Sequence, residues 1–294
     1  MSAPLRQTST SSIARVLRDV PRLTPAVWLL AASTAAGTGT AHASAIKAQA
    51  GPPSAEIAEV SGQLRQAWKA DPATASRPFP SIESLPSGRR IGDFCPSLRP
   101  PPGTPPVPPS PAAYCPTSQR VLVDGTALEA LGQPADRWAY AFWIATALGQ
   151  SLLQDGAPTA GTTPAAASLQ SFCLAGVLIG AAPALPPPAD PPDFVAPARN
   201  AYPSALAPSR GDRAQRGYAL LTGLGRTASG CSTTAMADLA MNRVPDPAVL
   251  DAVRSFERGS STRVFAVIRP RCQASANAPC PRSLPPVAPR GRTP

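Results

Sequence analysis

Histidine is nearly absent from this chain of 294 residues, which contains a single copy, His42. His42 lies in an N-terminal segment with the features of a cleaved leader, so the mature chain is predicted to contain no histidine. Serine or cysteine nucleophiles that need an imidazole base are thereby excluded. The only lysines, Lys47 and Lys69, are not near a glycine-flanked serine turn, so a Ser-Lys hydrolase is not predicted.

Other signatures of known chemistry are also missing. The cysteines lack the paired CxxC spacing of a four-thiolate zinc site, and no glycine-rich loop with its lysine is present to hold phosphate. The triplet 124–126 (Asp-Gly-Thr) permutes the aspartic-protease motif, has no second copy and is predicted to form a turn after a strand. The acids Asp124, Glu129, Asp136 and Asp155 show no spacing that requires a two-carboxylate site.

A run of apolar residues long enough for a convincing membrane span is missing too, but the N-terminus has a shorter one. Residues 1–24 carry four arginines and one acid, residues 26–32 are apolar, and Ala41-His42-Ala43 offers small residues for cleavage. This order is typical of a secretory signal peptide. Residues 1–43 are therefore predicted to direct export to the periplasm or the extracellular space, with an organelle transit peptide or an uncleaved membrane anchor as alternatives.

Acidic residues are outnumbered by basic ones, 17 to 27, which gives a formal charge of +10. Removing residues 1–43, with four Arg and one Asp, leaves +7. Aromatic residues make up only 5% of the chain and do not interleave with the arginines, so nucleic acid is not an expected partner. Affinity for an anionic envelope surface, or simply a solvated charged face, suits this charge better.

What the chain does have is cysteine in an even number and abundant proline. Six cysteines in an exported chain favour disulfides. The 40 prolines cluster at 96–116, 183–198 and 281–294, where they predict extended, unpacked segments. Because Cys95 and Cys115 flank the first cluster, we expect a disulfide there to close a long proline-rich loop, 96–113, at its base.

Between the proline clusters the apolar periodicity predicts helices. An amphipathic helix is expected at 55–69, and buried helices are expected at 134–153 and 164–182. Weaker patterns predict helices at about 214–225, 232–242 and 247–258. The β-prone run 119–124 predicts one short strand. The expected fold is thus α+β and predominantly helical, with a short strand before the central helix.

Three blocks of the sequence resemble the bacterial neutral zinc metallopeptidase family. Residues 114–116 (YCP), the strand 121–124 and the helix from Trp138 are similar to the approach to that family's HExxH helix. The block 168–178 (SLQSFCLAGVL) resembles the family's "ELQADCxAGxxA", and 252–259 (AVRSFERG) resembles "RVxxFxxG". The resemblance implies a zincin-like core and, for an intact member, a zinc cofactor.

The chain departs from the family where the chemistry should be. Thr146 and Gln150 stand at the two histidine positions of HExxH, and Ala147 stands at the position of the general base. Ser168 replaces the third ligand, the Glu of "ELQADC", and Phe172 replaces its Asp. Neutral Thr, Gln and Ser oxygens are poor zinc ligands. We therefore expect no catalytic residue, no metal and no cofactor, on a scaffold whose packing positions remain.

By analogy and order, the expected disulfides join Cys95 to Cys115, Cys173 to Cys231, and Cys272 to Cys280, although the sequence does not fix this connectivity. The expected organisation is a signal peptide (1–43), a helical segment with a linker (44–94), a metallopeptidase-like domain (95–260) and a basic tail (261–294).

The function favoured by these patterns is that of an exported pseudoenzyme that binds an unidentified peptide or protein, or an envelope surface. Two alternatives stay open. One is an active hydrolase or metallopeptidase with a rebuilt site, and the other is a structural cationic envelope protein.

Overall fold

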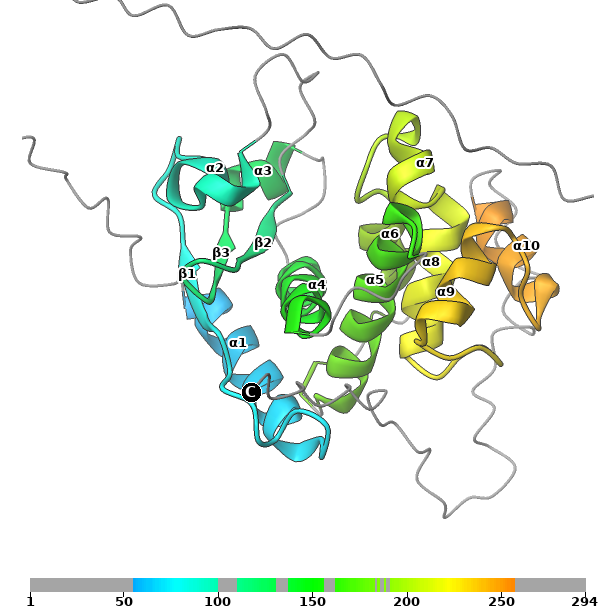
Figure 1. Cartoon of the computed structure of the whole chain (residues 1–294), viewed down its shortest axis with the longest axis horizontal. Coiled ribbons are helices and arrows are strands. Elements are labelled where there is room, and N and C mark those ends of the chain that lie inside the picture. The colour runs from blue at the N-terminus through cyan, green and yellow to red at the C-terminus, as the bar shows by residue number, and fades with distance from the viewer. Residues whose placement is uncertain are drawn as a thin grey trace, which may run out of the picture. The chain divides into compact units, whose positions relative to one another are not determined.

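The protein folds as a helix-dominated α+β structure with a small three-stranded mixed sheet, as the sequence predicts (Figure 1). The computed structural model describes residues 55–99, 110–130, 137–155, 162–182, 184–185, 188 and 191–256. The predicted signal peptide, most of the proline-rich loop, Cys272, Cys280 and the whole predicted basic tail, 261–294, lie outside these residues. The described elements are α1 (Ala55–Ala70), β1 (Ser81–Ser84), α2 (Ile91–Phe94), η1 (Pro96–Leu98), β2 (Ala112–Cys115), β3 (Arg120–Val123), α3 (Gly125–Ala130), α4 (Arg137–Asp155), α5 (Pro164–Ala181), α6 (Pro191–Arg199), η2 (Ser204–Leu206), α7 (Ala207–Arg210), α8 (Arg213–Gly223), α9 (Thr233–Ala240) and α10 (Pro247–Ser255).

The predicted helix at 55–69 is confirmed as α1. Its apolar stripe, Ile57, Val60, Leu64 and Trp68, is buried, and the helix packs on α4 and α5. The opposite face of α1 is largely exposed, as expected for a helix with one stripe toward the core. Helix α1 therefore shares a hydrophobic core with the helices that follow.

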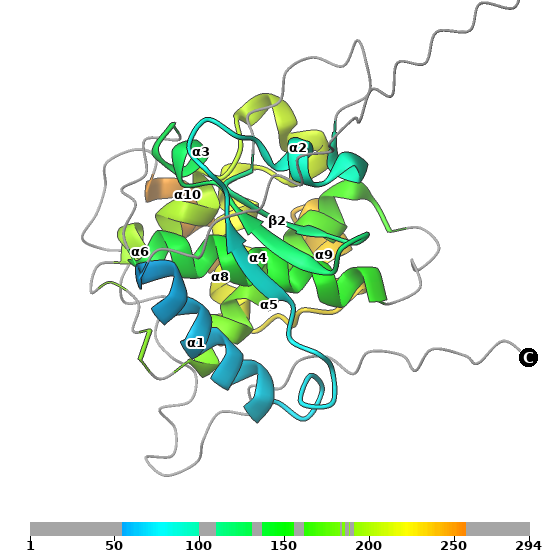
Figure 2. The same ribbon diagram turned by 90° about the vertical axis from the view of Figure 1, so that its left-hand side faces the viewer.

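The sheet has the strand order β1-β3-β2, with β1 parallel and β2 antiparallel to β3. The predicted strand at 119–124 is confirmed as β3, and its neighbours β1 and β2 were not predicted. Ala112 of β2 pairs with Val123, and Cys115 pairs with Arg120. Figure 2 shows the sheet in front of α4, which packs against β2.

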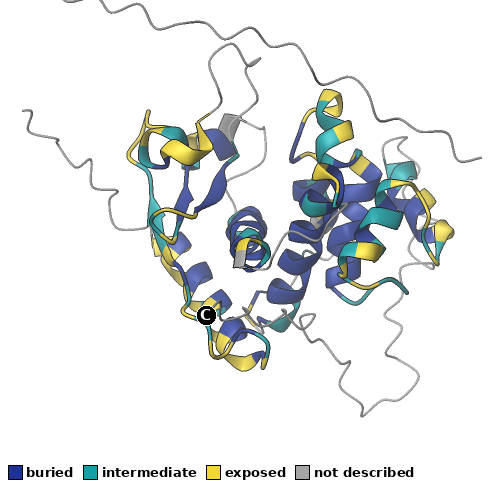
Figure 3. Ribbon diagram, in the orientation of Figure 1, coloured by how far each residue is buried: buried dark blue, intermediate teal, exposed yellow. Residues whose placement is uncertain are grey.

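Helices α4 and α5 form the centre of the molecule and confirm the predicted buried helices at 134–153 and 164–182, although residues 131–136 are not described. Thr163 caps α5, its side chain accepting a hydrogen bond from Ala166 N, and Pro164 occupies the first turn. Helix α5 is long and apolar enough to cross a bilayer, yet most of it is buried inside the protein (Figure 3). It contacts α1, α4, α7, α8 and α9 as a core helix.

Close backbone approach joins α5 to α8. A Cβ added at Gly223 would lie 1.9 Å from the carbonyl oxygen of Cys173, and one added at Gly176 would lie 2.5 Å from that of Leu220. No side chain fits at these distances. Glycine at both positions lets the two helix backbones pack directly against each other.

The prediction of an extended segment at 183–198 is wrong for its second half, because α6 is helical from Pro191 to Arg199. Proline is well tolerated in a first helical turn, where its missing N–H needs no partner. Pro197 lies inside the helix, but α6 is short and packs on α8 and α4. Arg216 of α8 donates hydrogen bonds to the carbonyls of Ala198 and Arg199, which satisfies the C-terminal end of α6.

Candidate functional site

The two positions that the motif resemblance aligns with the first histidine and the base lie deep in α4. Thr146 is 1% exposed, and its hydroxyl donates to the carbonyl oxygen of Phe142 at 2.8 Å. Ala147 is fully buried and supplies only a methyl group. Thr146 thus behaves as a core threonine that bonds back to its own helix.

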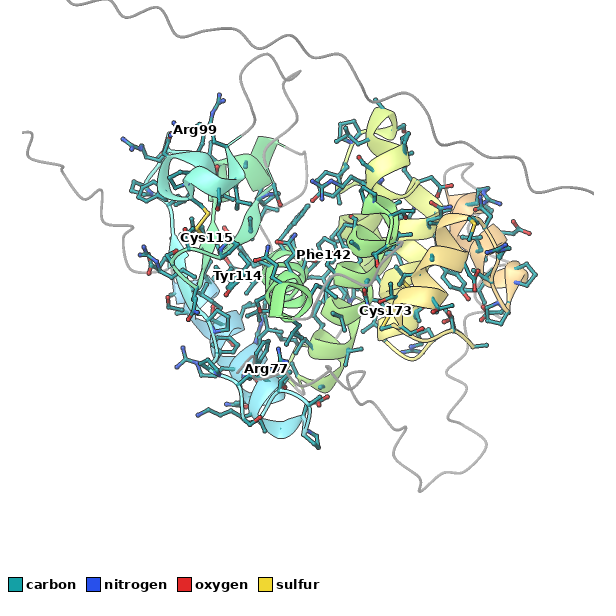
Figure 4. All side chains as sticks on the ribbon, in the orientation of Figure 1. Arg77, Arg99, Tyr114, Cys115, Phe142 and Cys173 are labelled. Carbon is teal, nitrogen blue, oxygen red and sulfur yellow. A yellow bond between two sulfur atoms is a disulfide. The ribbon has the colours of Figure 1, made fainter. Side chains whose placement is uncertain are left out.

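Gln150, which the motif resemblance aligns with the family's second histidine, connects α4 to the sheet. Its side-chain Oε1 accepts a hydrogen bond from the backbone N–H of Tyr114 in β2, with a donor–acceptor distance of 3.3 Å. Tyr114 is labelled beside α4 in Figure 4. The carboxamide therefore joins a helix to a strand.

Ser168 lies on α5 and is 7% exposed, and its carbonyl oxygen accepts from the Ser171 hydroxyl at 2.7 Å. One turn later, Phe172 stacks on Phe142 of α4, with ring centroids 5.5 Å apart. Phe172 is the residue that the motif resemblance aligns with the Asp of the family's second motif, and Figure 4 shows Phe142 on the side of α4 toward α5. The contact is apolar in a place where a metal site needs polar support.

Helical spacing brings positions 146 and 168 to the facing sides of α4 and α5. Phe142 and Gly149 of α4 both contact α5, at Phe172 and Ser171 respectively, and position 146 lies between them on the same face. Gln150 differs in that its polar end is directed to β2. Among the described residues, no hydrogen bond joins any two of Thr146, Gln150 and Ser168.

The residues at these positions do not fit a zinc ion. Their oxygens are neutral, the Thr146 hydroxyl and the Gln150 carboxamide oxygen are engaged with backbone groups, and the base position holds Ala147. In the part of the chain that the structure describes, no three His, Cys, Asp or Glu side chains gather closely enough to hold a metal ion. Zinc chemistry at this place has no ligand set to support it.

A wider aromatic cluster surrounds this contact. Trp143 meets Tyr202 edge to face at 6.1 Å and Phe142 at 5.1 Å, and Phe172 lies 6.3 Å from Tyr202. The Trp143 indole N–H is buried and has no hydrogen-bond partner among the described residues. The cluster packs α4 and α5 against the segment after α6, and its chemistry is that of a hydrophobic core.

Arg216 is the most deeply buried charged residue among the described residues, and the sequence analysis did not identify it. It is fully buried, and its guanidinium donates to the carbonyls of Ala198, Arg199, Tyr202 and Gly211. The described contacts pair it with carbonyl dipoles and with the Tyr202 ring, 6.0 Å away. This arrangement fixes the segment 198–211 onto α8, which is a structural role.

A second polar cluster joins α8 to the start of α10. The Tyr218 hydroxyl donates to Asp246 Oδ1, and Asp246 Oδ2 accepts from Ala228 N at 2.8 Å. Burial, followed by the hydrogen bond to this carboxylate, raises the pKa of Tyr218 well above its ordinary value. Tyr218 therefore stays protonated at neutral pH and serves as a donor that ties two helices together.

A surface pocket of about 190 Å³ lies at the start of α8, lined by Ser204, Asp212, Arg213, Ala214 and Arg254. Its charged groups already have partners in the protein. Asp212 caps α8 through Gln215 N, Arg213 donates to Asn200, and Arg254 pairs with Asp251. The pocket offers no set of free polar groups around which a ligand would be oriented.

The structure contains the predicted disulfides Cys95–Cys115 and Cys173–Cys231, with Cα–Cα distances of 5.7 and 5.5 Å. Two disulfides in one chain indicate an oxidising compartment outside the cytoplasm.

Comparison of the chain with protein-family models, with curated proteins and with solved structures gives no match.

Proposed function

We propose that this protein is an exported, non-catalytic relative of the bacterial neutral zinc metallopeptidases that binds a peptide or protein outside the cytoplasm. The proposal depends on the residue types and contacts at the four positions that the resemblance aligns with the zinc ligands and the general base. Thr146, Ala147, Gln150 and Ser168 all lack the groups for zinc binding and base catalysis, while the helices that hold them keep a dense, ordered interface.

The engagement of these residues in packing supports loss of the site over its reconstruction nearby. A rebuilt hydrolase needs a nucleophile or base with a supporting partner in reach. The polar atoms of Thr146 and Gln150 are used within the α4 helix and between α4 and β2. The adjoining positions 142 and 172 are aromatic and stacked. A scaffold kept without its chemistry is typical of a binding module.

Metal analysis of protein purified from an exporting host tests the loss of the site. After equilibration with zinc and removal of excess, we expect far less than one zinc per chain and no chelator-sensitive peptide cleavage. Stoichiometric zinc together with such cleavage would show that the protein is an enzyme.

A rebuilt variant tests the family resemblance itself. The combined substitutions Thr146→His, Gln150→His and Ser168→Glu restore the ligand types of the family, and we expect this variant to bind one zinc ion. The matched control changes Thr146 and Gln150 but keeps Ser168, and it should bind zinc much more weakly. If the triple variant folds, as judged by circular dichroism, yet binds no zinc, the three positions do not converge and the resemblance is wrong.

Affinity capture from envelope extracts tests the binding role. A discrete partner recovered in proportion to the bait is expected. Bulk association with the envelope, without such a partner, would instead favour the structural cationic protein.

A further inference from the structure

One end of the sheet carries a small projection that the proposed peptide-binding role does not use. We define the disulfide tip as residues 86–99, which follow β1 and contain α2 and η1. In Figures 1 and 2 the tip lies at the end of the sheet away from α1. Within the tip, Ile91 and Cys95 are buried. They pack with Ala113, Cys115 and Leu122 in a cluster separate from the main core.

The disulfide tip is held firmly although it is short. Cys95 is bonded to Cys115, the last residue of β2, and Cys95 N donates to the Ile91 carbonyl at 2.8 Å. These links fix the exposed stretches on either side, 86–90 and 96–99, against the sheet. The backbone of the tip therefore loses little further conformational entropy when the tip meets a surface.

The charge of the tip is mainly positive. Arg89, Arg90 and Arg99 are exposed, and Asp93 is the one acid in residues 86–99. Arg89 contacts Asp93 at 3.5 Å with both side chains largely in solvent, which is a weak interaction. Arg99, labelled in Figure 4, makes a long contact of 3.4 Å to the Gly92 carbonyl. The guanidinium groups remain available to an external anion.

An exposed apolar side chain lies among these arginines. Leu98 is 37% exposed, and Met241 is the other large apolar side chain exposed in the described part of the chain. Phe94, four residues before Leu98, is half-buried, and the Arg89 guanidinium lies 5.5 Å from the Phe94 ring. Arginine around a leucine and a phenylalanine is the composition of segments that bind the interface of an anionic bilayer.

We propose that the disulfide tip docks on an anionic lipid surface, with Leu98 entering the headgroup region and Arg89, Arg90 and Arg99 contacting lipid phosphates. The size of the tip favours lipid over a protein partner. A stable protein interface buries about 800 Å² on each side with 20–30 residues, more than this projection of 14 residues offers. The proposal rests on the location outside the cytoplasm and is independent of peptide binding.

Co-sedimentation with phosphatidylglycerol vesicles, using phosphatidylcholine vesicles for comparison, tests the tip in the full exported protein. The variant with Arg89→Gln, Arg90→Gln and Arg99→Gln should lose about fivefold in partition coefficient for each arginine, or roughly a hundredfold in total. The matched control with Arg65→Gln, Arg213→Gln and Arg243→Gln removes the same charge from exposed positions elsewhere and should lose much less. An equal loss in both variants would overturn the proposal, because binding would then follow net charge alone.

Insertion of Leu98 gives a second and separate measurement. The variant Leu98→Trp should show a blue-shifted emission on phosphatidylglycerol vesicles and quenching by brominated lipid, beyond the signal of the buried Trp68, Trp138 and Trp143. Absence of quenching while the protein is bound would contradict docking through the tip. Unchanged vesicle binding by the triple Gln variant, together with loss of a captured protein, would assign the tip to a protein partner and also overturn the proposal. Neither result depends on metal content, so these experiments test the tip independently of the proposed function.

Discussion

Arg216 shows how much of this fold depends on single buried polar side chains that form their hydrogen bonds within the protein. Its planar guanidinium reaches four carbonyls that lie 5 to 18 residues away in sequence, around the C-terminal end of α6. A buried cation is costly to desolvate unless its donors are satisfied. Here each nitrogen of the guanidinium donates to at least one carbonyl, which explains why arginine occupies a core position.

Replacing this arginine should be strongly destabilising. In Arg216→Met the four carbonyls lose their donor, and we expect the free energy of unfolding to fall by about 3 kcal/mol or more, measured by urea denaturation. Arg216→Lys keeps the charge but not the fork and should fall between Met and wild type. Arg213→Met, at an exposed position on the same helix, should change stability by less than about 0.5 kcal/mol. Similar losses at both positions would contradict the role given to Arg216.

At the scale of elements, the closest contact in the core is between helix backbones. Helices α5 and α8 meet at Gly176 and Gly223, where the Cys173 carbonyl oxygen would lie 1.9 Å from an added Cβ. Cys173 is itself tied to Cys231 before α9. The spacing of α5, α8 and the segment that leads to α9 is therefore determined at one place.

The substitution Gly223→Ala tests this contact. Because the obstacle is backbone, the helices must separate, and we expect a loss of about 3 kcal/mol in the free energy of unfolding. Gly62→Ala is the matched control, since Gly62 is exposed within α1 and an added Cβ meets nothing within 4 Å. That variant should gain up to about 1 kcal/mol from helix propensity. A neutral Gly223→Ala variant would show that α5 and α8 are not in direct backbone contact.

The elements that were predicted correctly are those whose burial follows a local period. Helices α1, α4 and α5 show their apolar pattern in the sequence itself, and β3 has a run of β-prone residues. Strands β1 and β2 were missed because Ser81–Ser84 and Ala112–Cys115 owe their conformation to pairing with β3. Helix α6 was missed because it contains three prolines, two in the first turn, where a helix tolerates them, and Pro197 inside, and because its end depends on a distant arginine.

The candidate site was likewise predictable only in part. The residue types at positions 146, 147, 150 and 168 come directly from the alignment of motifs. Their surroundings do not, because the Gln150–Tyr114 hydrogen bond spans 36 residues and joins a helix to an unpredicted strand. Arg120, which pairs with Glu83 across β1 and β3 at 2.8 Å, was equally beyond a local pattern.

At the scale of the whole molecule, two disulfides restrain different parts of the chain. Cys95–Cys115 spans 20 residues and fixes the disulfide tip to the sheet, whereas Cys173–Cys231 spans 58 residues and encloses α6, α7 and α8. Both restrict the unfolded chain, and the longer loop restricts it more.

Removing each bridge separately measures these contributions. The variant Cys95→Ala/Cys115→Ala should lose about 3 kcal/mol and Cys173→Ala/Cys231→Ala about 4 kcal/mol in the free energy of unfolding, by urea denaturation without reductant. Only the first should also weaken vesicle binding, since it frees the tip. The reverse order of stabilities, or vesicle binding lost only with the second bridge, would contradict this division.

Gln150 has a final consequence for any partner that approaches the sheet. Tyr114 lies on β2, an edge strand of the described sheet, and the Gln150 side chain is bonded to the Tyr114 N–H. An incoming extended peptide that sought this amide would compete with an acceptor tethered in the same molecule at a high effective concentration. Gln150 would thus act as an internal competitor for this edge amide, and strand addition at β2 would have to displace it.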